Sequence, residues 1–305
     1  LKEASNILRK GLDNNPEDNS LRYYLADLLN EEGYTVEAKR LFWECVTRNP
    51  KDWESKYKLG NLYQQQEKYT LALSMYKKVS MHKKNCLFVK IKIADLYQKM
   101  GNKKNAQVFY QHALNDKQIS SKQLQHVATN LLEIGAIKIA TNIFEKLVNK
   151  KFESEGLFIN LSNLYLSAGR FDDSINLLKH AREKYPSNEI IHFNLGNLHK
   201  KEGNFLEAIK EFKLAINIKS NFPQAYSNLG VTYNNIGEYS RGLKLLNRSL
   251  SINRKTSATR YSSLTNIGIV FITLGKFKEG WEKYEYRWKV DPGDKVVWPL
   301  KDKAL

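Results

Sequence analysis

The sequence has little cysteine, little proline and no long apolar run. Two cysteines among 305 residues exclude a disulfide framework and fit a reducing compartment. Six prolines and sixteen glycines exclude collagen-like and low-complexity chains. No apolar run reaches the roughly 18 residues that cross a bilayer, so no membrane partner is expected. Together these absences indicate a cytoplasmic protein.

Patterns that carry chemistry are also missing. The six histidines form no set with metal-ligand spacing, and neither His-Glu-x-x-His nor Gly-x-Gly-x-x-Gly occurs. His192 and His199 fall on an expected apolar helix face, so we interpret both as core residues. Gly275 and Lys276 lack the other residues of a phosphate loop and indicate a turn. The sequence therefore predicts no enzyme activity and no cofactor for this chain.

The sequence does contain a repeat of 34 residues. Cut from residue 19, seven units reach residue 256 without insertion or deletion, and an eighth unit follows at 261–294. Positions 8 and 20 are small in every unit, position 24 is large, and position 15 is glycine except at Glu67. Apolar residues recur at helical spacing on both sides of position 15. Each unit is therefore predicted to be two antiparallel helices joined by a turn with positive φ, and the pairs must stack into a solenoid.

These columns resemble the tetratricopeptide repeat family from residue 19 to about residue 288. The resemblance implies an all-α, right-handed superhelical solenoid whose concave groove is lined by the first helix of each pair. The predicted division of the chain is the second helix of a truncated repeat at 1–18, seven contiguous repeats at 19–256, a spacer at 257–260, an eighth repeat-like unit at 261–294, and a tail at 295–305 that leads to a missing domain.

The stretch from Gly280 to Trp288 carries a second resemblance. Its Gly-Trp-x-x-Tyr-Glu-x-Arg-Trp pattern, followed by Trp298-Pro299-Leu300, is similar to a segment that precedes a glycosyltransferase domain in bacterial repeat proteins. The resemblance implies such a domain in the same parent chain. At about 100° per residue, Trp281, Tyr284 and Trp288 share one helix face. These rings either cap the last pair themselves or, with Trp298, contact another domain; we predict the interdomain contact.

Positions 2, 6, 9 and 13 of the first helices lie about half a turn from the packing stripe and are predicted to line the groove. They hold nine charged residues in the first four units and only Lys201 in the last four. Position 6 changes in the same place, from Tyr, Lys, Lys and His to four asparagines. The asparagines of the last four units are Asn160, Asn194, Asn228 and Asn266 at position 6, and Asn163 and Asn197 at position 9.

Asparagine is about 0.7 kcal/mol worse than alanine inside a helix, yet its carboxamide can pair with both the N–H and the C=O of a peptide group. First helices about 10 Å apart would meet an extended chain at about every third residue. The row resembles the asparagine ladder of the O-linked N-acetylglucosamine transferase family, which binds substrate peptides along its groove. We therefore predict an interaction scaffold that binds extended peptide through these six asparagines. The alternative is that asparagine at these positions serves only the repeat itself.

A competing function is binding of nucleic acid or another anionic partner through a basic surface. The chain has 49 basic and 32 acidic residues, a formal net charge of +17. The charges of the predicted groove cancel, however, so the excess must lie on other faces. Because the groove is neutral, the sequence favours protein partners over nucleic acid.

Overall fold

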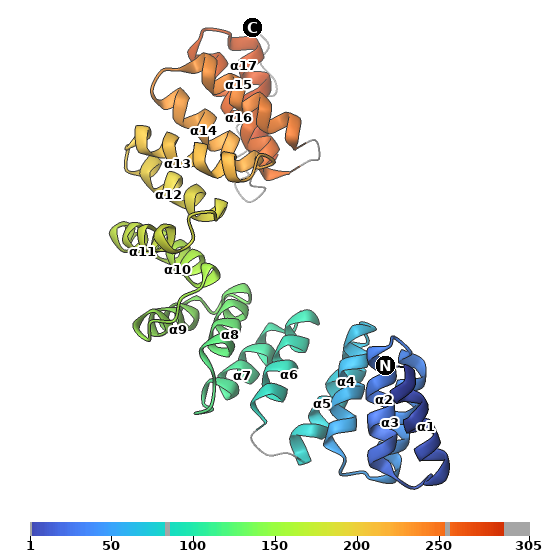
Figure 1. Cartoon of the computed structure of the whole chain (residues 1–305). Coiled ribbons are helices and arrows are strands. Elements are labelled where there is room, and N and C mark those ends of the chain that lie inside the picture. The colour runs from blue at the N-terminus through green and yellow to red at the C-terminus, as the bar shows by residue number, and fades with distance from the viewer. Residues whose placement is uncertain (1, 83–85, 254–256, 290–305) are drawn as a thin grey trace, which may run out of the picture. The chain divides into compact units, whose positions relative to one another are not determined.

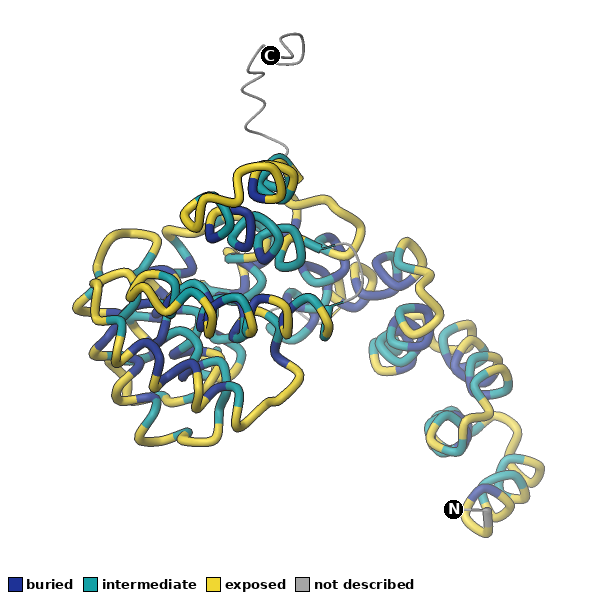
Figure 2. Tube along the Cα trace, turned by 90° about the horizontal axis from the view of Figure 1, so that it is seen from above, coloured by how far each residue is buried: buried dark blue, intermediate teal, exposed yellow. Residues whose placement is uncertain are grey.

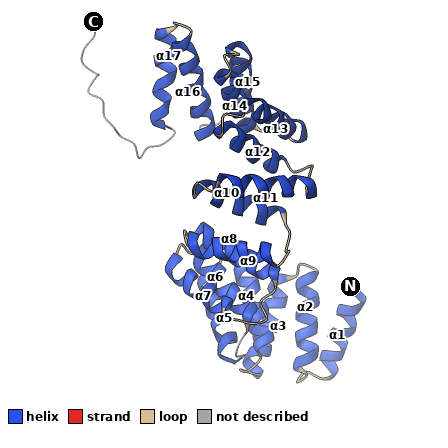
Figure 3. Cartoon of the chain, turned by 90° about the vertical axis from the view of Figure 1, so that its left-hand side faces the viewer, coloured by secondary structure: helices blue, strands red, loops and turns tan. Residues whose placement is uncertain are grey.

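The computed structural model describes residues 2–82, 86–253 and 257–289. Helices and the turns between them account for these residues, and no strand occurs among them (Figure 3). The chain divides into two compact units, Leu1–Phe152 and Glu153–Leu305.

The helices follow one another with short connections (Figure 1). In the first unit they are α1 (Lys2–Asn14), α2 (Asn19–Glu31), α3 (Thr35–Arg48), α4 (Trp53–Gln65), α5 (Tyr69–His82), α6 (Leu87–Lys99), α7 (Lys103–Leu114), α8 (Ser121–Glu133) and α9 (Ile137–Asn149). In the second unit they are α10 (Glu155–Ser167), α11 (Phe171–Lys184), α12 (Glu189–Lys201), α13 (Phe205–Ile218), α14 (Pro223–Asn235), α15 (Tyr239–Ile252), α16 (Ala258–Thr273), α17 (Phe277–Tyr284) and the 3₁₀ helix η1 (Glu285–Lys289).

Consecutive helices pack as pairs, from α2 with α3 to α16 with α17. The predicted all-α stack of helix pairs is therefore confirmed. Within each unit the helices have buried faces that point at their neighbours and exposed faces that point away (Figure 2). The residues predicted as a spacer hold the N-cap of α16: the Ser257 side chain accepts the backbone N–H of Arg260, and the helix begins at Ala258.

The turn inside each pair has the left-handed backbone conformation that the glycine column predicts. Seven glycines, from Gly33 to Gly275, have φ between +74° and +91°. The eighth turn reaches the same region with Glu67, at φ +57°. A non-glycine residue there costs about 1–2 kcal/mol, so packing of the helix pair imposes the turn even where the residue opposes it.

Small residues at position 8 let the two helices of a pair approach closely. A Cβ atom on Gly60 would lie 2.5 Å from the ring of Tyr76, and one on Gly196 would lie 2.7 Å from the ring of Phe212. Both rings are fully buried. The large residue at position 24 thus fills the space that the small residue leaves, as the sequence pattern predicts.

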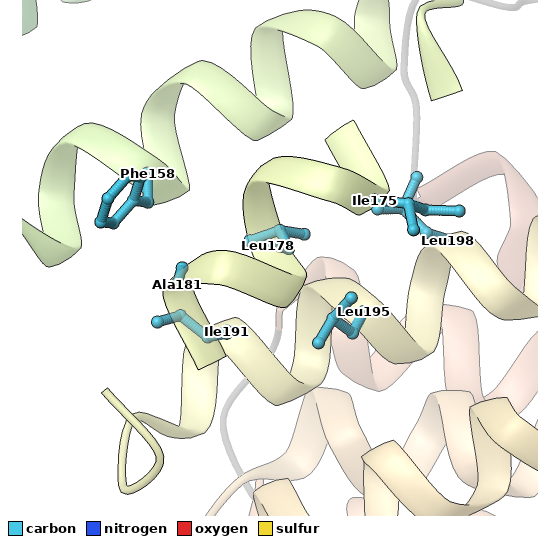
Figure 4. Packing of buried hydrophobic residues seen from close by; sticks show 7 residues of the cluster. All are labelled: Phe158, Ile175, Leu178, Ala181, Ile191, Leu195 and Leu198. Carbon is cyan, nitrogen blue, oxygen red and sulfur yellow. The ribbon is translucent and has the colours of Figure 1, made fainter. Parts of the chain in front are cut away.

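The core continues from one pair to the next. One cluster joins three successive helices, α10, α11 and α12, and its side chains converge between them (Figure 4). Its members are Phe158, Ile175, Leu178, Ala181, Ile191, Leu195 and Leu198. Burial of each large side chain of this kind stabilises the folded chain by about 1.5–3 kcal/mol. This packing fixes the positions of the first helices within the unit.

A candidate peptide-binding surface

The predicted asparagines all lie on first helices of the second unit. Asn160 and Asn163 are on α10, Asn194 and Asn197 on α12, Asn228 on α14 and Asn266 on α16. Side-chain caps fix where these helices begin: Ser154 precedes α10, and Asn188 precedes α12 and accepts the backbone N–H groups of two residues. Asn163 is exposed and the other five are half-buried, so none of the six asparagines is fully buried in the core.

Two of the position 6 asparagines bind the position 9 asparagine of the preceding repeat. Asn194 Nδ2 donates to Asn163 Oδ1 at 3.2 Å, and Asn228 Nδ2 donates to Asn197 Oδ1 at 2.6 Å. The partners of each pair are 31 residues apart. Asn160 and Asn266 have no asparagine at the equivalent position, which holds threonine and valine respectively. The predicted row of four is thus two bonded pairs flanked by single amides.

Each bonded pair keeps unused hydrogen-bonding groups. The donating residue, Asn194 or Asn228, keeps its Oδ1 oxygen, and the accepting residue, Asn163 or Asn197, keeps its Nδ2 amino group. Within the part of the chain that the structure describes, these groups bind no other protein atom. An acceptor and a donor therefore recur together on successive first helices, as the N–H and C=O of an extended chain require.

The first unit uses the same positions for charged pairs. Lys58 Nζ bonds to Asp27, and His126 Nε2 lies 3.0 Å from Asp95 Oδ1; the partners are again 31 residues apart. The Asp95 hydrogen bond raises the pKa of His126. Asp95 also accepts the hydroxyl proton of Tyr110 at 2.7 Å. These pairs between repeats were not predicted. Comparing position 9 of each repeat with position 6 of the next repeat could have revealed them, because the two positions carry opposite charges.

The rings near the C-terminus depart from the predicted single helix face. Helix α17 ends at Tyr284, and Trp288 lies on the 3₁₀ helix that follows. The guanidinium of Arg287 lies 4.2 Å from the Tyr284 ring centroid and 4.3 Å from that of Trp288. The three rings therefore do not share one α-helix, although Trp281 packs edge-on against Tyr284 and Arg287 lies against both Tyr284 and Trp288. Trp281 is 53% exposed, and Trp298 lies outside the described residues.

Family models match parts of both units. The tetratricopeptide repeat model matches residues 54–80, 89–115 and 223–256, and a related TPR repeat model matches residues 200–237. Each unit therefore contains segments that match tetratricopeptide repeat models. Their fold supports a protein-interaction scaffold, because stacked pairs of this kind create extended concave binding surfaces.

Solved structures with the same fold come from several bacteria. A tetratricopeptide repeat protein from Parabacteroides merdae is 15% identical with a TM-score of 0.57, over 80% of this chain and 97% of that one. The C-terminal part of a TPR repeat-containing protein from Cytophaga hutchinsonii is 13% identical with a TM-score of 0.58, over 78% and 96%. MamA from Desulfovibrio magneticus is 11% identical with a TM-score of 0.51, over 56% and 96%. At these identities the likeness shows the fold alone.

No curated protein matches the sequence significantly. None of the helices among the described residues is long and apolar enough to span a membrane. The same part of the chain contains no group of three or more histidine, cysteine, aspartate or glutamate residues placed to hold a metal ion.

Proposed function

We propose that the chain is a protein-interaction scaffold whose second unit binds extended peptide segments. The observation that carries this proposal is the repeated amide pair, Asn163 with Asn194 and Asn197 with Asn228. Each pair holds its carboxamides in a fixed orientation and leaves one acceptor and one donor for a ligand. This acceptor and donor are neutral and would bind the main chain of the peptide. The surface would therefore bind peptides with many different side-chain sequences.

The electrostatics of this face support a neutral peptide. Lys201 is the one charged residue at positions 2, 6, 9 and 13 of the last four repeats, and its ammonium lies 4.3 Å from the ring centroid of Phe171. A surface that binds nucleic acid by neutralising phosphates needs several unpaired cations. The surface of the second unit instead carries a row of neutral amides, which suits a neutral peptide.

The proposal extends to the parent protein. We infer that the chain is the substrate-recruiting arm of a larger bacterial, cytoplasmic glycosyltransferase. The support is the sequence from Gly280 to Trp288, together with the exposure of Phe277 and Trp281 at the last pair, 60% and 53%. A coding sequence that continues past residue 305 into a nucleotide-sugar domain would support this extension, and an immediate stop codon would contradict it.

The peptide proposal can be tested by replacing Asn194 and Asn228 with alanine together. The probe is a fluorescein-labelled neutral peptide of about twelve residues, such as repeated Thr-Ala-Ser, because such a peptide spans about four repeats. Loss of two to three hydrogen bonds, each worth about 1 kcal/mol, should weaken binding roughly thirty- to 150-fold in fluorescence anisotropy.

A matched control replaces two exposed asparagines on second helices, Asn176 and Asn217, with alanine. This variant makes the same chemical change away from the proposed surface, so it should bind as the unmodified protein does. Equal affinity of the Asn194→Ala/Asn228→Ala variant and the control variant would remove the amide pairs from peptide binding.

A further inference from the structure

The excess positive charge of the chain is concentrated in the later part of the first unit. Residues 69–152, from the start of α5 to the end of that unit, contain fifteen lysines, four acidic residues and no arginine. This stretch accounts for +11 of the formal net charge of +17. Such an excess attracts an anionic partner, and the placement of the lysines decides which partner fits.

Five of these lysines lie on one side of the second helices α5, α7 and α9, which are labelled in Figure 1. Positions 18, 19, 22, 25, 26 and 29 of a repeat fall within about 120° of one another, at about 100° per residue. They lie opposite positions 20, 24 and 27, which are fully buried in all three helices. We call these six positions of the three helices the outer face. Its exposed lysines and apolar residues are Leu71, Lys77, Lys78 and Met81 on α5, Lys104 and Val108 on α7, and Lys138 and Lys146 on α9.

The outer face is positively charged and almost free of acidic residues. Within the described part of the chain, none of its five lysines forms an ion pair with a carboxylate. By contrast, Lys90 on the first helix α6 is paired with Asp116, at 3.7 Å between Nζ and Oδ2. Glu145, which is half-buried, is the one acidic residue at the outer-face positions. The positive charge of this face is therefore available to a partner outside the chain.

Exposed apolar side chains lie among these lysines. Met81 is 75% exposed, and Leu71 and Val108 are 45% and 40% exposed. The outer-face positions hold no arginine, tyrosine, phenylalanine or tryptophan. Nucleic-acid surfaces use arginine for bidentate phosphate contacts and aromatic rings for base stacking. Lysines mixed with apolar residues instead suit a lipid surface, because its headgroups bind ammonium groups and its acyl chains accept apolar side chains.

Two second helices of the second unit resemble this face only in part. Helix α15 has three exposed cations at the same positions but no apolar residue there; the cations are Arg241, Lys244 and Arg248. Helix α13 exposes Leu206 at position 18, yet the neighbouring Glu207 is acidic and pairs with Lys210 at 2.6 Å. These helices supply matched positions at which charge and apolar surface can be altered separately.

We propose that the outer face of α5, α7 and α9 binds the surface of a membrane that contains anionic lipids. The lysines bind the headgroup phosphates, and Leu71, Met81 and Val108 enter the boundary between headgroups and acyl chains. A surface contact of this kind requires no long apolar run. Peptide binding is assigned to first helices of the second unit, so the two surfaces share no residue and one chain can use both.

The test measures binding of the full chain to large unilamellar vesicles by co-sedimentation, at about 0.15 M salt so that distant charges are screened. Vesicles of phosphatidylcholine with about 30% phosphatidylglycerol should bind the chain at least tenfold more tightly than phosphatidylcholine alone. The variant Lys78→Gln/Lys104→Gln/Lys146→Gln removes one lysine from each helix. A lysine near an anionic surface is worth about fivefold in affinity, so this variant should bind about a hundredfold more weakly.

The control Arg241→Gln/Lys244→Gln/Arg248→Gln makes the same change in net charge on α15. Its affinity for the vesicles should stay within about threefold of that of the unmodified chain, since charges away from the contact are screened at this salt. Met81→Gln should weaken vesicle binding by about fivefold, because it removes apolar surface from the contact. Leu206→Gln makes the matching change on α13 and should leave binding unaltered. All the replaced side chains are exposed, so circular dichroism should show equal melting temperatures.

Three results would overturn the proposal. Equal loss in the two triple variants would show that net charge alone attracts the vesicles. Equal binding to vesicles with and without phosphatidylglycerol would remove the requirement for anionic lipid. Tighter binding of a single-stranded RNA, lost in the three-lysine variant and unchanged in Met81→Gln, would assign the outer face to nucleic acid. The three-lysine variant should bind the Thr-Ala-Ser peptide normally, which separates this test from that of the amide surface.

Discussion

At the scale of single residues, the charges buried beside α12 determine how the second unit responds to pH. His192 is 4% exposed; its Nδ1 lies 2.6 Å from Glu211 Oε2 and its Nε2 lies 3.0 Å from the carbonyl oxygen of Pro186. Both neighbours accept hydrogen bonds, so the imidazole is held in its doubly protonated form. The hydrogen bond to Glu211 raises the pKa of His192 above its ordinary value.

Glu211 is shifted in the opposite direction. Burial favours its neutral form, but hydrogen bonds from His192 and from Arg182 Nη1, the latter at 2.7 Å, outweigh burial and lower the pKa of Glu211. The prediction that His192 is a core residue is confirmed. Its charged partner was not predicted, because Glu211 lies on the following helix at position 23, which is apolar in six of the eight repeats.

We therefore predict a pH-dependent stability contribution from His192. Because its pKa is raised in the folded state, the contribution is complete below the unfolded value of about 6.5 and is lost as pH rises through the folded pKa. The carboxylate contribution of Glu211 is present above about pH 4.3 and is lost as pH falls through its lowered pKa. The measurement compares Tm of the unmodified chain with that of His192→Gln between about pH 5 and 9. The difference should be largest near pH 6 and should shrink with rising pH, whereas a constant difference would contradict a charged His192.

At the scale of helix pairs, the closeness of α12 and α13 depends on one small residue. Gly196→Ala improves helix propensity by about 1 kcal/mol but places a Cβ 2.7 Å from the buried Phe212 ring. Overpacking of a core costs about 1–3 kcal/mol, so we expect a net destabilisation of about 1 kcal/mol in urea unfolding.

The control for this prediction comes from another pair of the same chain. Ser162 and Leu178 occupy the corresponding positions, and both are fully buried. In a Phe212→Leu background, Gly196→Ala should therefore become neutral or stabilising, because the clash is gone and the propensity gain remains. A stabilising effect of Gly196→Ala in the unmodified chain would show that the helices are not in close contact there.

The sequence predicts helix pairs well because their determinants repeat. The glycines at position 15 indicate the left-handed turns. Glu67, the one non-glycine residue at this position, has the same left-handed conformation. The end of α17 at Tyr284 could not be read from periodicity, because the following residues leave the helix while Arg287 packs on the rings of Tyr284 and Trp288. Spacing rules assume that a helix continues, and they do not say where its last turn ends.

The candidate site could be predicted only in part for a related reason. Residue type and period place the asparagines on first helices. They do not show that Asn194 binds Asn163 and Asn228 binds Asn197, because hydrogen bonding depends on which rotamers bring side chains of two repeats together.

At the scale of the whole molecule, a change in surface chemistry coincides with the division into two units. Position 6 changes from His126 to Asn160 across the boundary between Phe152 and Glu153. The 34-residue period continues through this boundary, so the period alone does not reveal it. The pairs between position 9 and the next position 6 are charged in the first unit and neutral in the second.

Backbone N-methylation of the peptide would show whether the second unit recognises a peptide by its main chain. Three labelled peptides would be compared by anisotropy on the full chain: the Thr-Ala-Ser repeat, the same composition in another order, and the repeat with every third peptide nitrogen methylated. Methylation removes a backbone donor, so affinity should fall by about tenfold or more, while reordering should change it by less than about twofold. Binding that survives methylation but is abolished by reordering would contradict main-chain recognition.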